Sequence, residues 1–428
     1  MLDQAIGVGE DRVAGALPCR RKGTSMAVRS CKIACLVAAL SLLVLGAVAA
    51  PQARAGSRQA TAVGTNQVIA VPYYSWNNKA RYATVVLPRD YGPGNNEALP
   101  CIVQPHGRES TPLGPASRWG DLPTTERFMV ICPDSSGRRD PENSWAVAGQ
   151  LQDIAEIAGV VESSLPWVHI DHQRLYLAGI SMGGQETLCT LARYPDLFAA
   201  GLCVDGNADL AARYRELPLA DMADVQPLMR REVGGTPAKV PWLYQRRSST
   251  PFAATLATCG VPIAIWWSAE DPIGVNQAKT QTGHLWSKIM SLAPGAPVVQ
   301  VIGTGGHGTM LSQHPQAGVD YFRPNGVWRT LPAAPTTWDY GSWLPSAGAW
   351  GYEFGTAAGS HKLWRVHVAP GSLAVSCPAP LIAQVPYDAA GPVAVTVNSV
   401  EQPPVMPVDG HISISFPAGK STATYATE

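Results

Sequence analysis

The sequence predicts an α/β fold, a mostly parallel sheet with helices on both faces, followed by a small C-terminal all-β appendage. Three observations carry this prediction. Short apolar runs alternate with helical patterns between Val68 and about Pro324. One of these runs, Leu175–Ile180, breaks into Gly-x-Ser-x-Gly around Ser181 and continues as a helical pattern. After about Pro332, alternating strand-like stretches rich in Trp, Gly and Ser take over.

Length and composition agree with a large α/β domain plus an additional module. The chain has 428 residues, of which 46% are hydrophobic and 15% charged, so it can bury a sizeable core. Its formal net charge is zero. Bulk electrostatics therefore give no reason to expect a nucleic-acid partner or attraction to acidic lipids.

The N-terminus reads as a targeting segment. Arg29 and Lys32 precede the apolar run Ile33–Ala50, and small residues with Ala-x-Ala spacing follow. We predict that residues 1–55 form a leader with a signal peptide whose start is Met26, and that the mature protein is secreted. Because the apolar run is long, an uncleaved membrane anchor is the alternative, and the leader is then the only contact with the membrane.

Nine cysteines are present, three of them in the leader. An exported chain can form disulfides, so the remaining six allow up to three bridges of unknown connectivity. No cysteine or histidine spacing matches a zinc site, and no metal is expected. The six cysteines outside the leader are Cys101, Cys132, Cys189, Cys203, Cys259 and Cys377.

Ser181 stands in the pattern of a nucleophile elbow. So tight a strand-to-helix turn needs neighbours without bulk, which Gly179 and Gly183 provide. The turn lifts the serine hydroxyl above the sheet, and the helix predicted over Gln185–Tyr194 offers unpaired N–H groups at its start. The alternative is a structural serine in a turn, but the strand, the helix and downstream partners favour the elbow.

Partners for this serine follow in the order that such a site requires. The strand Val261–Trp267 leads to Asp271, and a Gly-rich loop after the last predicted strand carries His307. Asp205, which follows an earlier strand, is an alternative acid. Glu270 is expected to face solvent or to brace the loop.

Two further segments are expected near the site. The predicted strand Pro100–Gln104 runs into His106-Gly107-Arg108, where Gly107 permits a bend and His106 is expected to brace the loop. Residues 208–250 interrupt the β/α rhythm as an insertion, either a lid or side wall over the pocket or a remote decoration. The predicted lining residues are Trp242, Tyr244 and Trp267.

The predicted domains are a catalytic α/β domain over 56–332 and a β-rich domain over 333–428, the latter a small β-sandwich or β-appendage. Four tryptophans lie close together in the second domain. Packing into its core or interface is favoured over an exposed polymer-binding surface. These tryptophans are Trp338, Trp343, Trp350 and Trp364.

The order Ser181, Asp271, His307, with His106-Gly107 upstream, resembles the α/β-hydrolase superfamily. The segments Arg81–Pro88, Ile170–Arg174 and Ser181–Gly184 look like those of secreted esterases and depolymerases. They are also similar to the catalytic domain of prolyl-oligopeptidase-type peptidases.

The resemblance implies a role for each residue. Ser181 would be the nucleophile, His307 the general base and then acid, and Asp271 its orienting carboxylate. The backbone N–H groups of Met182 and of Arg108 or Gly107 would form the oxyanion hole. Two departures from the family pattern are Ser268, where many members have Gly, and Arg108, where further glycines are usual.

The implied function is a secreted serine hydrolase that cleaves carboxylic esters, small or polymeric, through an acyl-enzyme on Ser181, with no cofactor. An ester is favoured because no segment of β-propeller size precedes the catalytic domain to select peptides. A prolyl-oligopeptidase-type peptidase is the first alternative. An inactive hydrolase scaffold that acts as an extracellular binding protein is the second.

Overall fold

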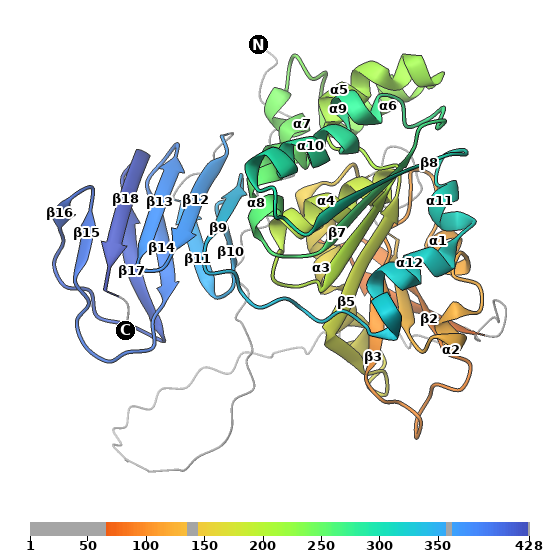
Figure 1. The fold of residues 1–428 in the computed structure, drawn as a ribbon, viewed down its shortest axis with the longest axis horizontal. Helices are drawn as coiled ribbons and strands as arrows, with labels where there is room; N and C mark the ends of the chain where they lie inside the picture. Colours follow the sequence, from red (N-terminus) through yellow and green to blue (C-terminus); the bar gives the residue numbers. More distant parts are fainter. Residues whose placement is uncertain (1–65, 135–143, 357–361, 427–428) are drawn as a thin grey trace, which may run out of the picture. The chain divides into compact units, whose positions relative to one another are not determined.

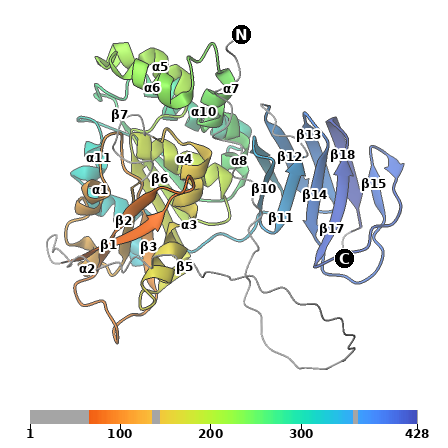
Figure 2. The same cartoon turned by 180° about the vertical axis from the view of Figure 1, so that it is seen from behind.

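The computed structural model describes residues 66–134, 144–356 and 362–426 (Figures 1 and 2). The predicted leader, residues 1–55, lies outside the described residues. None of the helices in the described part of the chain combines the length and the apolar character that crossing a bilayer requires.

An eight-stranded sheet organises the first part of the chain (Figure 1). Its strand order is β1-β2-β4-β3-β5-β6-β7-β8. β2 is antiparallel to both its neighbours, and every neighbouring pair from β4 to β8 is parallel. The strands are β1 (Gln67–Tyr74), β2 (Ala80–Leu87), β3 (Leu99–Val103), β4 (Met129–Pro133), β5 (Ile170–Ile180), β6 (Ala200–Val204), β7 (Ile263–Ser268) and β8 (Val298–Gly303).

Helices pack on both faces of this sheet because its central strands are apolar on both sides. Cys101 and Val103 of β3 join one buried cluster and Ile102 joins the other, as the period of two in a strand requires. The first cluster includes side chains of α3 (Ala148–Ser164), α4 (Met182–Arg193), α8 (Ala253–Thr258) and α10 (Thr282–Leu292). The second includes side chains of α1 (Leu113–Ser117), α11 (Thr309–Ser312) and α12 (Pro315–Phe322).

The predicted insertion is helical and has a small core of its own. That core contains Leu210, Val225 and Tyr244 from the insertion, together with Met182 and Trp145. Its elements are α5 (Leu210–Glu216), α6 (Val225–Val233), α7 (Pro241–Arg246) and the short 3₁₀ helices η2 (Leu217–Ala220) and η3 (Thr250–Phe252). Short elements elsewhere are α2 (Leu122–Thr125), α9 (Gln277–Thr280) and η4 (Pro324–Gly326).

The C-terminal part consists of two antiparallel sheets around one apolar core. One sheet has the order β10-β11-β14-β17 and the other β16-β15-β18-β13-β12-β9. Trp338 and Trp364 are buried in this core and the partly buried Trp350 packs against it, which confirms the predicted packing for these three tryptophans. The strands are β9 (Trp338–Ser342), β10 (Ser346–Ala349), β11 (Tyr352–Thr356), β12 (Trp364–Ala369), β13 (Ser372–Cys377), β14 (Leu381–Pro386), β15 (Val395–Val397), β16 (Val400–Glu401), β17 (His411–Phe416) and β18 (Gly419–Tyr425).

The predicted fold class, a mostly parallel α/β sheet followed by antiparallel β structure, is therefore confirmed. The disulfides that the cysteine count allows are not formed, since all six cysteines are free and buried. Cys101 and Cys132 illustrate the reason, because their side chains join the clusters on opposite faces of the sheet. These cysteines serve as small apolar core residues.

Candidate active site

Ser181 lies on a sharp turn between β5 and α4. Its backbone angles, φ 61° and ψ −123°, fall in a region that non-glycine residues rarely adopt and that costs on the order of 1–3 kcal/mol. A Cβ atom on Gly179 would lie 2.1 Å from the Gly183 carbonyl oxygen, and one on Gly183 would lie 2.4 Å from that of Pro105. A side chain at either position would collide with the backbone, so both positions require glycine, as the elbow pattern predicts.

The His106-Gly107 loop reaches this turn. A Cβ atom on Gly107 would lie 3.7 Å from Ser181 Cβ. His106 is buried, and its ring nitrogens lie 2.7 Å from the Gly107 carbonyl oxygen and 3.1 Å from that of Asp134. The buried imidazole therefore lies between two backbone carbonyl oxygens, either of which can accept its N–H, and it has the predicted bracing role in the loop.

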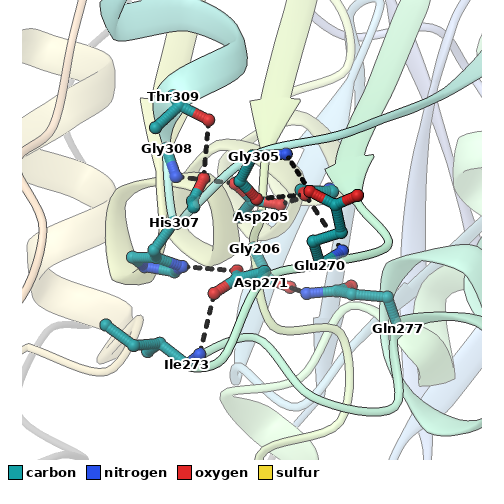
Figure 3. A network of polar contacts seen from close by, with 12 residues as sticks. Asp205, Gly206, Glu270, Asp271, Ile273, Gln277, Gly305, His307, Gly308 and Thr309 are labelled. Atoms are coloured by element: carbon teal, nitrogen blue, oxygen red, sulfur yellow. Dashed lines mark hydrogen bonds and ion pairs between the residues drawn. The ribbon is translucent and has the colours of Figure 1, made fainter.

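Asp271 and His307, which follow β7 and β8, meet at hydrogen-bonding distance (Figure 3). His307 Nδ1 lies 2.6 Å from Asp271 Oδ2, and the other carboxylate oxygen accepts the Ile273 N–H at 2.8 Å. Because Nδ1 is bonded to a carboxylate, it carries the proton and Nε2 is left as the acceptor. Nε2 has no hydrogen-bond partner among the described residues.

Burial and the imidazole act in opposite directions on Asp271. Desolvation raises the pKa of this carboxyl group, but the hydrogen bond from His307, the attraction of the ring in its protonated form and the backbone N–H groups of Gly274 and Ile273 together lower it below its ordinary value. Asp271 therefore stays ionised next to the ring.

Asp205, the alternative acid, has different partners. One carboxylate oxygen accepts the backbone N–H group of Ser268 at 2.9 Å. The other accepts that of Gly308 at 2.7 Å (Figure 3). Burial raises the pKa of Asp205 despite these bonds, and the nearby Asp271 carboxylate adds to the rise. Asp205 thus ties the loop after β8 to the ends of β6 and β7.

Two more groups hold the loop that carries His307. Glu270 Oε2 accepts the Gly305 N–H at 3.0 Å, and the Ser268 hydroxyl donates to the Gly305 carbonyl. Glu270 is exposed and braces the loop, one of its two expected roles. Ser268, one of the departures from the family pattern, therefore has a structural use here.

Ser181 and His307 line one pocket of about 250 Å³. Gly107 and Arg108 line it too, as the predicted oxyanion loop requires. Met182 is the first residue of α4, so its N–H group has no hydrogen-bond partner within that helix. Within the described residues, neither the Gly107 nor the Arg108 N–H donates a backbone hydrogen bond. Both remain candidates for the second donor.

The predicted lining residues need correction, because none of them lies in this pocket. Tyr244 is buried in the core of the insertion and donates to the Gly235 carbonyl at 2.9 Å. Trp242 packs against Arg246, whose guanidinium carbon lies 5.1 Å from the ring centroid. Trp267 belongs to the core of the sheet. Large aromatic side chains were needed for packing here rather than for the pocket.

Other residues, which the sequence did not indicate, line the pocket instead. Met222 comes from the insertion, which therefore forms part of the wall, and Arg118 follows α1. Neither stands in a recognisable motif, so only the folded chain reveals their position. The rest of this unpredicted set is Ser110, Ile180, Ile273, Gly308 and Ser312.

The same polar cluster could be considered for a metal ion. Ligand atoms of Asp205, Asp271 and His307 lie within 4.8 Å of one another. However, all four carboxylate oxygens already accept hydrogen bonds from the imidazole or from backbone N–H groups. The arrangement is accounted for by these hydrogen bonds.

Comparisons with known proteins find relatives for part of the chain. The model of the "Prolyl oligopeptidase family" matches residues 125–257, which include Ser181 but neither Asp271 nor His307. The chain is 30% identical over 128 residues to the "Uncharacterized peptidase YtmA" of Bacillus subtilis, covering 30% of this chain and 46% of that protein. It is 28% identical over 115 residues to the "Poly(3-hydroxyalkanoate) depolymerase C" of Paucimonas lemoignei, covering 25% of this chain and 28% of that protein.

Among solved structures, the acylaminoacyl peptidase of Pyrococcus horikoshii superimposes with a TM-score of 0.48 and 17% identity, over 63% of this chain and 43% of that chain. The chain spans less than half the length of the curated relatives it matches. The sheet, the elbow and the family match define a protein of the α/β-hydrolase superfamily, which confirms the predicted resemblance. These two curated relatives are a peptidase and a depolymerase.

Proposed function

We propose that this protein is a serine hydrolase that cleaves carboxylic esters through an acyl-enzyme on Ser181. One observation carries the proposal: the Asp271-bonded imidazole of His307 keeps Nε2 without a partner among the described residues, in the pocket that Ser181 also lines. The Ser181 and His307 side chains are not hydrogen-bonded to each other in this structure, but an imidazole oriented by a carboxylate can accept the proton of a serine in the same pocket once the two come within hydrogen-bonding distance.

In the proposed reaction, Ser181 Oγ attacks the ester carbonyl while His307 Nε2 takes its proton. The N–H groups of Met182 and of Gly107 or Arg108 stabilise the developing oxyanion, each by about 3 kcal/mol. His307 then returns the proton to the leaving alcohol, and the acyl group stays on Ser181. A water molecule, deprotonated by the same nitrogen, attacks this acyl-enzyme, and His307 returns the proton to Ser181 Oγ as the bond to the acyl group breaks and the acid leaves.

The charge of the pocket favours an ester over a peptide with a free amino terminus. Its described lining residues include Arg108 and Arg118 but no carboxylate. A substrate ammonium group would therefore find no ionic partner among these lining residues, and Arg118 would repel it. The depolymerase among the relatives supports a polymeric or oligomeric ester as one substrate.

A serine peptidase is the second candidate. The family model that matches residues 125–257 and the relative from Bacillus subtilis both point to peptidases. The same three side chains would cleave an amide, so substrate preference has to be measured.

The test is a substrate panel of para-nitrophenyl acyl esters, an aliphatic polyester film and dipeptidyl amides. We expect ester turnover that falls by on the order of a million-fold in Ser181→Ala. Ser291→Ala, which changes an exposed serine at the end of α10, is the matched control and should keep full activity. Faster hydrolysis of the amides would favour the peptidase. Absence of all turnover in folded protein would favour a binding scaffold.

We further propose that the protein is exported, because the predicted leader resembles a signal peptide. The N-terminal sequence of the protein recovered from culture medium tests this proposal. A mature terminus near residue 50 to 56 is expected, and retention in the membrane fraction with the leader intact would indicate an anchor.

A further inference from the structure

Arg118 is fixed in place beside the proposed nucleophile. It caps the C-terminus of α1, where its backbone N–H donates to the Pro115 carbonyl at 3.1 Å. The next residue, Trp119, is fully buried and donates to Gln104 Oε1 at 2.6 Å. The backbone that carries Arg118 is thus anchored in the core, and its half-buried side chain lines the pocket with Ser181 and His307.

The Arg118 guanidinium has no anionic partner in the part of the chain that the structure describes. Other arginines do: Arg127 pairs with Asp90 and Glu97, and Arg174 with Asp171. Desolvation lowers the pKa of Arg118, with only the Cys132 thiol acting against it. A guanidinium stays protonated nevertheless, so the pocket contains a partly desolvated charge that no residue in the described ranges neutralises.

The rest of the pocket does not supply that compensation. No carboxylate is among its described lining residues. Arg108, the other cation in the lining, is paired with the exposed Glu109. The charge of Arg118 therefore remains available to a ligand.

We infer that Arg118 is a specificity residue that binds a carboxylate carried by the ester substrate. The inference rests on the proposed ester hydrolysis and narrows its substrate class. A planar guanidinium presents paired N–H donors that match the two oxygens of a carboxylate. Such a group can lie on the alcohol side, as in oligoesters of hydroxy acids, or on the acyl side, as in monoesters of dicarboxylic acids.

Two matched pairs of substrates distinguish a carboxylate on the alcohol side from one on the acyl side. The first is a linear hydroxybutyrate dimer as the free acid and as its terminal primary amide. The second is the para-nitrophenyl monoester of adipic acid and para-nitrophenyl hexanoate. We expect the wild-type protein to prefer the acid in at least one pair by about tenfold or more in kcat/KM, a preference that salt weakens.

Arg118→Gln should abolish this preference while hydrolysis of the neutral partner stays within about threefold of wild type, and Arg118→Lys should keep part of it. Arg89→Gln, at an exposed arginine after β2, is the control and should change neither value. A wild-type preference for the neutral member of both pairs would overturn the inference. So would an equal loss on acid and neutral substrates in Arg118→Gln, which indicates a structural or transition-state role.

A binding measurement separates this inference from the proposed reaction. In Ser181→Ala protein, calorimetric titration with monomethyl adipate should give binding at least about tenfold tighter than with dimethyl adipate, and adding Arg118→Gln should remove the difference. Carboxylate binding without any ester turnover in the wild-type protein would contradict the proposed function alone. Ester turnover without this difference in binding would contradict the role of Arg118 alone.

Discussion

The loops after β6 and β7 each place a buried aspartate next to His307, yet the two carboxylates have different partners. Asp271 bonds to the imidazole, whereas Asp205 bonds to the backbone of Ser268 and Gly308. Their pKa values move in opposite directions, lowered for Asp271 and raised for Asp205. Residue type and burial are the same, so the donor that each carboxylate faces decides its role.

The largest expected effect separates the two aspartates by activity. Asp271→Asn should lower kcat/KM for a neutral ester by about ten-thousand-fold, because an amide at this position favours the wrong imidazole tautomer. Asp339→Asn is a matched control, since Asp339 also bonds to a histidine, with its Oδ1 2.9 Å from His367 Nδ1, but on β9 in the C-terminal part. It should leave activity unchanged. If Asp205→Asn showed a loss of this size and Asp271→Asn did not, Asp205 would be the carboxylate that orients His307.

Asp205→Asn should have an intermediate effect. One of the two backbone N–H groups would face an amide NH₂ group, the loop that carries His307 would shift, and activity should fall by about 10- to 100-fold. The free energy of unfolding, from urea titration, should fall by about 1–3 kcal/mol. Unchanged stability and activity would show that the hydrogen bond from Gly308 does not position His307.

Gly308→Ala tests the same loop from its backbone. Gly308 has φ +73°, and a Cβ atom would lie 2.7 Å from Ile180 Cγ2, on the residue before Ser181. We expect about tenfold lower activity and about 1–2 kcal/mol lower stability. Gly326→Ala is the control, with φ +78° and open space around the position, so only the stability loss should appear. Equal activity in both variants would contradict the predicted displacement.

The smallest expected effect is a difference in pH dependence. Asp271 has a folded-state pKa below 3.8, so below that pH the unfolded chain binds more protons and stability rises as pH rises. Asp205 has a folded-state pKa above 3.8, so between 3.8 and that value the folded chain binds more protons and stability falls as pH rises.

Urea unfolding from about pH 3 to about pH 7 should therefore show opposite changes when wild type is compared with Asp271→Asn and with Asp205→Asn, on the order of 1 kcal/mol each. The wild-type advantage over Asp271→Asn should shrink toward the acid end, where the Asp271 carboxylate begins to take up a proton. Slopes of the same sign would contradict the assigned pKa directions.

The sequence predicted the parts of this molecule that local patterns determine. Alternation of apolar runs and helices predicted the parallel sheet, and the small residues around Ser181 predicted the elbow. The order of motifs predicted that Asp271 and His307 would meet. Asp205 could only be held as an alternative, because both aspartates follow buried strands and only the folded loop shows which one reaches the imidazole.

The pocket wall could not be predicted in this way. Arg118 and Met222 come from a helix end and an insertion, and no motif marks them. Trp242 and Tyr244 were wrong because aromatic size favours core packing as much as a pocket. A pocket wall is assembled from segments distant in sequence, so its members depend on loop conformations that residue patterns do not specify.

Reaction with a fluorophosphonate tests the central claim, that Ser181 is activated by the His307–Asp271 pair, most directly. Intact-mass analysis should give one adduct per wild-type chain, peptide mapping should locate it on Ser181, and Ser181→Ala should remain unmodified. His307→Ala should react slower by several orders of magnitude. An adduct on another residue, or no adduct on folded protein, would contradict the account.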